Sequence, residues 1–203
     1  MPTPRFKRLR NKFEGFSEEV YPDEKGIPTV GPGISLNSPE VPQILNEMGY
    51  DPSRVKSGEQ LISPEHLESI ANEQLKEKQR YLQTIQKQDF PEYKPTENEL
   101  NALMLLMSNS PKLIGPNLRD RLNKNDRFGA FDEIISRSNK DKSPGVQFRR
   151  MQEAEEFAGE NAPEYFQRLP TSQKDEMRSI LEQTQNPGHL EDIKKRFPQL
   201  WQK

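Results

Sequence analysis

The sequence predicts an α+β fold that is mainly helical, with one small β-hairpin near the N-terminus. Two observations lead to this prediction. Apolar residues recur at helical i, i+3, i+4 spacing over most of the chain, and several of these runs begin with a capping residue. Residues 22–33 instead combine a turn, a short strand and paired glycines. A length of 203 residues suits one domain with an appendage, or two small domains.

The composition is polar for a folded chain. Hydrophobic residues make up 31% of it, charged residues another 31%, and the mean hydropathy is −1.03. We therefore expect small cores with well-hydrated surfaces. The sequence has no cysteine and two histidines, so it favours neither disulfides nor a zinc site, and we expect no metal or organic cofactor. A net charge of −2 gives no general attraction to nucleic acid, and none is expected as a partner.

The chain carries no segment typical of membrane insertion or secretion. No apolar run approaches the roughly 18 residues of a membrane-spanning helix, and residues 1–5 lack the apolar core of a signal peptide. We therefore expect no signal peptide and no membrane insertion.

A first helix is predicted from four apolar residues at helical spacing, which are Phe6, Leu9, Phe13 and Phe16. Gly15 is a residue type that commonly ends helices. Glu14 is therefore expected on a rigid helix end.

A turn and a short strand follow this helix. Asp23 lies in residues 22–26, a turn by composition, and residues 27–30 are predicted as an edge strand. Two carboxylates on separate elements are what glycoside hydrolysis needs, one protonated and one ionised. Glu14, flanked by phenylalanines, is the candidate for a raised pKa, and Asp23 for the ionised group. By residue type alone, either carboxylate is as well explained as a surface charge.

The whole stretch is more specific than its carboxylates. Glu-Gly, then Tyr-x-Asp, then Gly-x-x-Thr-x-Gly-x-Gly resembles the N-terminal signature of phage-type lysozymes, the endolysins of glycoside hydrolase family 24. The resemblance implies Glu14 as general acid, Asp23 as second carboxylate and Thr29 as the hydroxyl that helps hold the attacking water. It also implies a substrate-binding or site-supporting role for Tyr21, Gly31 and Gly33. The pattern departs at Ile34, where many relatives carry histidine.

A second stretch, residues 145–153, resembles the family's Gly-aliphatic-x-x-Arg-Arg-x-x-Glu signature. A basic residue of this helix characteristically approaches the catalytic glutamate. The resemblance makes Arg149 the first candidate for that role and Arg150 the second. Such a guanidinium would orient Glu14 but also favour its charged form.

The remaining elements follow from caps and periodicity. Residues 35–63 are predicted as loop around a short helix at 44–48. A long helix is predicted over 64–88, a buried helix with a capping box over 96–107, two short helices near 118–135 with a break at 123–126, and a capped helix over 144–157. The resemblance implies that the long helix joins two lobes.

Residues 161–203 are predicted as a helical extension, with helices at 171–182 and 190–197. We expect it to dock onto the rest of the chain through an apolar face formed by Phe166, Leu169, Ile180 and Leu181. The alternative is carbohydrate stacking through Trp201, the one tryptophan of the chain.

The resemblance implies a two-lobed, lysozyme-like domain over 1–160, with a small lobe at about 13–62 and a helical lobe at about 63–160 that includes the N-terminal helix. It implies a muramidase that cleaves peptidoglycan between N-acetylmuramic acid and N-acetylglucosamine. The protein would act from the host cytoplasm with a holin-type release partner, or be carried in the virion. Two alternatives remain: a virion structural or binding protein that kept the fold, and a lytic transglycosylase.

Overall fold

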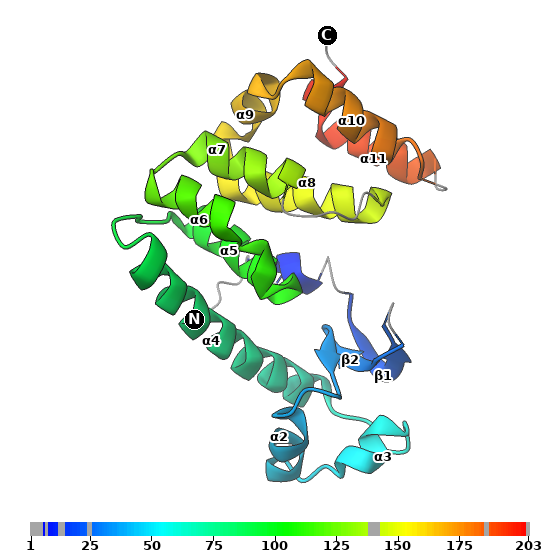
Figure 1. The fold of residues 1–203 in the computed structure, drawn as a ribbon. Helices are drawn as coiled ribbons and strands as arrows, with labels where there is room; N and C mark the ends of the chain where they lie inside the picture. The colour runs from blue at the N-terminus through cyan, green and yellow to red at the C-terminus, as the bar shows by residue number, and fades with distance from the viewer. Residues whose placement is uncertain are drawn as a thin grey trace. The chain divides into compact units, whose positions relative to one another are not determined.

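The computed structural model describes residues 6, 8–11, 15–23, 26–137, 143–184 and 187–201. The chain forms two compact units, residues 1–80 and residues 81–203, called here the N-terminal and C-terminal units (Figure 1). Each is described by itself. No helix among the residues that the structure describes is both long and apolar enough to cross a membrane.

The N-terminal unit contains a three-stranded antiparallel sheet in the order β1-β2-β3. The strands are β1 (Ser17–Pro22), β2 (Pro28–Gly31) and β3 (Ile34–Ser35). Two short helices follow, α2 (Val41–Glu47) and α3 (Pro52–Lys56), and then the long helix α4 (Pro64–Asp89), which starts where the sequence predicts it. Aliphatic side chains from β2, β3, α2, α3 and α4 form the core of this unit.

The first helix is partly confirmed. Among its described residues, positions 6 and 8–11 are helical, and Phe6 is buried. Arg10, also buried, donates from Nη2 to Glu68 Oε1 of α4 at 3.0 Å. The prediction for Phe16 was wrong: its side chain is 42% exposed and lies in an unpaired segment before β1. The preceding Gly15 has a left-handed φ of 72°, which turns the chain out of the helical path.

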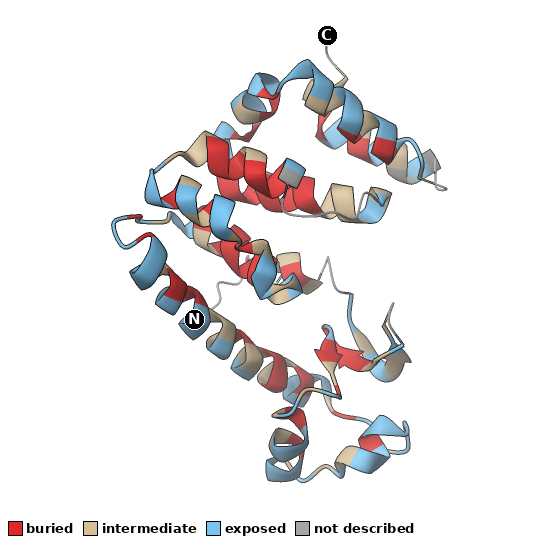
Figure 2. Cartoon of the chain, viewed as in Figure 1, coloured by how far each residue is buried: buried red, intermediate tan, exposed pale blue. Residues whose placement is uncertain are grey.

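All the regular secondary structure described in the C-terminal unit is helical. After α4 come α5 (Glu97–Asn109), η1 (Pro111–Leu113), α6 (Pro116–Asn123), α7 (Arg127–Asp132), the π-helical turn η2 (Glu133–Arg137), α8 (Pro144–Ala158) and η3 (Gly159–Asn161). Helices α5 and α8 pack against each other, and Figure 2 shows both as largely buried. The predicted capping box is present at Thr96 and Glu99.

The extension folds as α9 (Ala162–Arg168), α10 (Thr171–Leu181), α11 (Pro187–Arg196) and η4 (Pro198–Leu200). Phe166 lies against Phe131 of α7 and against Phe197, with ring centroids 5.1 Å apart in both pairs. All four residues of the expected apolar face are buried. The indole Nε1 of Trp201 is buried, and the residue as a whole is half-buried. Carbohydrate stacking through Trp201 stays an untested alternative.

Candidate active site

The turn between β1 and β2 fixes the position of Asp23. The backbone N–H of Asp23 donates to the carbonyl of Ile27 at 2.9 Å, and the N–H of Gly26 donates to the carbonyl of Asp23 at 2.8 Å. The side chain closes the same turn, because the N–H of Ile27 donates to Asp23 Oδ1 at 2.8 Å. Gly26 takes the φ of 75° that this turn requires. The half-buried carboxylate of Asp23 is thus held at the end of the hairpin by a backbone N–H of the same turn.

Thr29 lies on the next strand, within reach of the same turn. It pairs with Tyr21 across β1 and β2 and with Ser35 across β2 and β3, and 5% of its surface is exposed. Its hydroxyl donates to the carbonyl of Ile27 at 3.0 Å. The proton of Thr29 is therefore engaged, and the Oγ1 lone pairs are what it offers to a water molecule. The hairpin register brings Tyr21, Asp23 and Thr29 to one end of the sheet.

The two motif glycines end β2 and begin the return to β3. Gly31 has φ 62° and Gly33 φ 87°, a region that side chains disfavour. A Cβ at Gly31 would lie 3.2 Å from Cδ2 of Leu67 on α4, so the close approach of the strand to this helix needs glycine. The site-supporting role expected of both glycines stays a prediction.

Ile34, at the position where many relatives carry histidine, is buried in the core of the N-terminal unit. It belongs to the same apolar cluster as Val30 and Leu67. A histidine here would face an apolar environment that penalises its charged form. In this chain the position serves packing.

Glu14, the predicted general acid, lies outside the described residues. The distance between its carboxyl and that of Asp23, expected at about 6.5–9.5 Å for an inverting enzyme, therefore stays a prediction. The approach of Arg149 or Arg150 to Glu14 also stays a prediction.

Arg149 and Arg150 form an ionic cluster with Glu153, called here the α8 triad. Arg149 Nε donates to Glu153 Oε1 at 3.2 Å, and Arg150 Nη1 donates to Glu153 Oε2. The side chain of Glu153 is 0% exposed, that of Arg150 2% and that of Arg149 19%. Burial raises the pKa of Glu153, and the charges of Arg150 and Arg149 oppose this rise.

Glu153 is the glutamate that ends the second signature, and no role was predicted for it. Its spacing from Arg149 and Arg150, four and three residues, was the available signal, because these are the spacings at which helical side chains meet. Two neighbouring glutamates of α8 have partners too. Glu156 accepts from Asn101 Nδ2 at 3.2 Å, and Glu155 accepts from Arg196 Nε at 2.9 Å.

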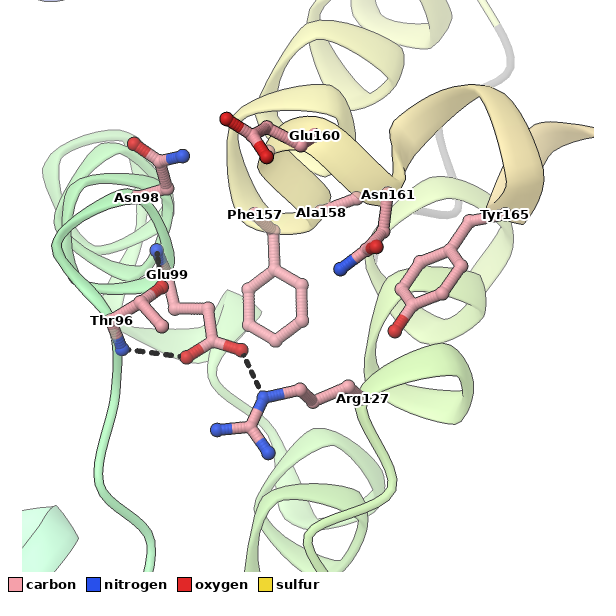
Figure 3. Close-up of a pocket in the computed structure, with 10 residues that line it drawn as sticks. Thr96, Asn98, Glu99, Arg127, Phe157, Ala158, Glu160, Asn161 and Tyr165 are labelled. Carbon is pink, nitrogen blue, oxygen red and sulfur yellow. Dashed lines mark hydrogen bonds and ion pairs between the residues drawn. The ribbon is translucent and has the colours of Figure 1, made fainter.

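A pocket of about 190 Å³ lies elsewhere in the C-terminal unit, between α5, α7, α8 and α9 (Figure 3). The carboxylate of Glu99 accepts from the N–H of Thr96 and from Arg127 Nε, both at 2.7 Å. Burial, followed by the charge of Glu99, raises the pKa of nearby Tyr93. Glu99 and Arg127 are thus engaged in a helix cap and an ion pair, and no predicted site residue lines this pocket.

Metal ligation finds no support in the described part of the chain, where no three histidine, aspartate or glutamate side chains converge. The Asp23 carboxylate accepts from the N–H of Ile27, and the Glu153 carboxylate is paired with two arginines.

These features define a class: a mainly helical protein with a small antiparallel sheet, carrying a carboxylate in a hairpin turn and a pair of arginines on a helix. A family model described as phage lysozyme matches residues 11–153, and the chain belongs to the phage lysozyme family. Its fold is similar to that of an endolysin from Escherichia coli O157:H7 phage FAHEc1, with a TM-score of 0.59 and 21% identity, over 79% of this chain and 94% of that one.

A mutant of P22 lysozyme is similar to the same degree, with a TM-score of 0.58 and 20% identity, over 77% of this chain and 97% of that one. No curated protein sequence matches the chain. Family membership supports a lysozyme-type glycosidase that acts on peptidoglycan in general. At these identities the structural likeness shows the fold, and the fold class predicted from the sequence is confirmed.

Proposed function

We propose that the protein is a muramidase, which hydrolyses the β-1,4 bond between N-acetylmuramic acid and N-acetylglucosamine. Glu14 protonates the leaving oxygen, and Asp23 with Thr29 positions a water molecule for attack. No metal or organic cofactor takes part. The observation that carries the proposal is the hairpin, where Asp23 and Thr29 share Ile27 as a hydrogen-bonding partner.

The hairpin supports a water mechanism for a chemical reason. Asp23 Oδ1 already accepts from the N–H of Ile27, and the second oxygen is not used in that bond. A carboxylate has lone pairs on both oxygens, so the second one can accept a proton from water. Thr29 Oγ1, whose own proton goes to Ile27, can accept from the same water. Two acceptors that orient one water leave its oxygen lone pair for attack on the sugar carbon.

A lytic transglycosylase needs the general acid alone, and its mechanism would give Asp23 and Thr29 no catalytic role. A virion structural protein would need neither carboxylate. The protein would reach the wall by one of two routes. It would pass from the host cytoplasm through a membrane pore made by another phage protein, or it would be carried to the wall in the phage particle.

The masses of the muropeptides released from purified peptidoglycan separate these functions. A muramidase adds one water to each cleaved bond, a transglycosylase gives anhydro products without added water, and a structural protein releases nothing. We expect hydrated products. Anhydro products, or none, would contradict the proposal.

A further inference from the structure

Two pockets of the C-terminal unit adjoin at Arg127, which lines both. One is the pocket of Figure 3, and the other, of about 430 Å³, lies between the segment before α5 and the turn from α6 to α7. We call the two together the asparagine groove, because four asparagines line them: Asn98, Asn123, Asn125 and Asn161. We propose that the asparagine groove binds a neutral glycan. The site lies within one unit and uses none of the predicted catalytic residues.

The first support is the supply of hydrogen-bonding groups. Within the described parts of the chain, the side-chain amides of Asn98, Asn123 and Asn161 have no hydrogen-bonding partner. Each amide offers two N–H donors and a carbonyl acceptor, whichever way its two ends are assigned. A sugar hydroxyl both donates and accepts, so two neighbouring hydroxyls can bind one amide at both ends. The groove therefore matches a ligand that is rich in hydroxyl groups.

The second support is the shape of the pocket in Figure 3. Gly159 ends α8 with a left-handed φ of 57°, and a Cβ there would lie 2.5 Å from Nδ2 of Asn98. Glycine thus leaves space for the Asn98 amide at the pocket. Figure 3 shows Asn98 and Asn161 on either side of the Phe157 ring. The C–H groups of a sugar ring can pack on an aromatic side chain while its hydroxyls reach amides at the edge.

The third support is the balance of charge. Three glutamates and two cations line the groove, namely Glu92, Glu99, Glu160, Lys94 and Arg127. Arg127 is already engaged, because its Nε donates to Glu99 Oε1 at 2.7 Å and its Nη1 donates to Asn125 Oδ1 at 2.6 Å. Such a lining gives no strong attraction to a polyanion or a polycation. An uncharged ligand fits it best.

A peptide is also rich in amides, but the groove suits a glycan better. Peptides are commonly bound as a strand added to a sheet edge or as a helix in an apolar groove. The described part of the C-terminal unit has no sheet edge. Three of the four asparagines, Asn123, Asn125 and Asn161, are exposed, so the groove has a polar rim in place of an apolar one.

The test is an NMR titration of the full chain, observed at the side-chain NH2 signals of Asn98, Asn123 and Asn161. The probes are chitotetraose and cellotetraose, two uncharged β-1,4 tetrasaccharides of which only the first carries N-acetyl groups. We expect the three signals to shift with a dissociation constant of about 1 mM, a weak affinity that suits an open, polar groove. Shifts with chitotetraose alone would identify the ligand as an acetylated glycan, such as that of peptidoglycan. Shifts with both probes would identify it as a β-1,4 glycan in general.

Asn161→Ala and Asn46→Ala form a matched pair of variants. Both replace an exposed asparagine, and Asn46 lies on α2, outside the groove. Asn161→Ala should raise the dissociation constant observed at Asn98 and Asn123 by about 2- to 10-fold, the effect of one lost hydrogen bond. Asn46→Ala should leave this constant unchanged. Both variants should keep the wild-type kcat on soluble peptidoglycan fragments, because neither residue has a catalytic role.

Two results would overturn the inference. One is the absence of any shift at the three asparagines with either probe at about 10 mM, ten times the expected dissociation constant. The other is a dissociation constant in Asn161→Ala equal to that of Asn46→Ala, which would place the sugar elsewhere. The proposed function fails separately: a protein that hydrolyses no peptidoglycan while its asparagine signals shift would refute the muramidase and leave the groove as a glycan site.

Discussion

The two units of this protein place polar groups in different ways. In the N-terminal unit, the predicted site residues Asp23 and Thr29 are held by backbone hydrogen bonds of one tight turn. In the C-terminal unit, charged side chains are held by other side chains, as in the α8 triad and the pair of Glu99 with Arg127. A turn fixes a carboxylate with few residues, whereas a buried charge needs a hydrogen-bonded partner of opposite charge.

The cores of the two units also differ, in the kind of side chain that fills them. The N-terminal core is a cluster of aliphatic side chains from β2, β3, α2, α3 and α4, among them Val30, Ile34, Leu67 and Ile70. The C-terminal core has an aromatic cluster in which Phe131, Phe166 and Phe197 lie in series. We infer that the larger, aromatic unit supplies most of the stability and that the small unit supplies the water-positioning chemistry. The following predictions test this division.

The largest effect on stability is expected from Phe166→Ala. This ring is buried between α7 and the end of the chain, and such truncations cost about 3–5 kcal/mol. Turnover at low temperature should stay near the wild-type value. Tyr81→Ala, at a position that is 49% exposed, serves as control and should change the free energy of unfolding by no more than about 0.5 kcal/mol. Urea denaturation measures the free energy of unfolding of both variants. A Phe166→Ala variant as stable as Tyr81→Ala would refute the inference that the C-terminal unit supplies most of the stability.

A smaller effect, on turnover alone, is expected from Thr29→Ala. Loss of the hydroxyl leaves the attacking water badly held, and kcat should fall by about 10-fold while folding is retained. Thr29→Ser keeps the hydroxyl and should recover most of the activity. Proton NMR of the first-formed product adds a check on mechanism. An initial α-anomer from the β-linked substrate fits attack by this water, and an initial β-anomer would remove the role given to Thr29.

The smallest effect is expected at the cap of α3. Asp51 accepts from the side chain and N–H of Ser53 and from the N–H of Arg54, which lowers its pKa below the ordinary value of 3.8. The stabilisation by Asp51 is therefore present above pH 3.8 and is lost as the pH falls through the lowered pKa. Asp51→Ala should lower the urea midpoint slightly at pH 7, and the difference from wild type should narrow at acidic pH. A difference independent of pH would contradict the role of the charge.

Much of the fold follows from the sequence because its helices carry local signals. Pro64 at the first position of α4 and the Thr96 capping box define helix starts within one residue of those observed. Strand β1 was not predicted, since its side chains are half-buried or exposed and show no regular alternation. Helix α3 was missed because it has five residues and a cap as its main signal. Short elements are stabilised by their neighbours, which a local pattern does not show.

The candidate site also has a part that local sequence predicts and a part that it does not. Asp23 and Thr29 follow from a motif within one hairpin, where local sequence fixes geometry, and the structure brings them to one turn. The burial of Glu153 and Glu156 was not predicted, because burial arises from packing between helices far apart in sequence. A local pattern does not show these tertiary contacts.

The most direct test of the account is the wall-lysing activity of Glu14→Gln beside the wild type. The substitution keeps the shape of the side chain and removes the proton that the acid delivers, so lysis of permeabilised cells should fall by about 10² to 10⁴-fold. The melting temperature should not change. Residual activity above about a tenth of the wild-type rate, in a variant folded as well as the wild type, would contradict the assignment of Glu14 as the general acid.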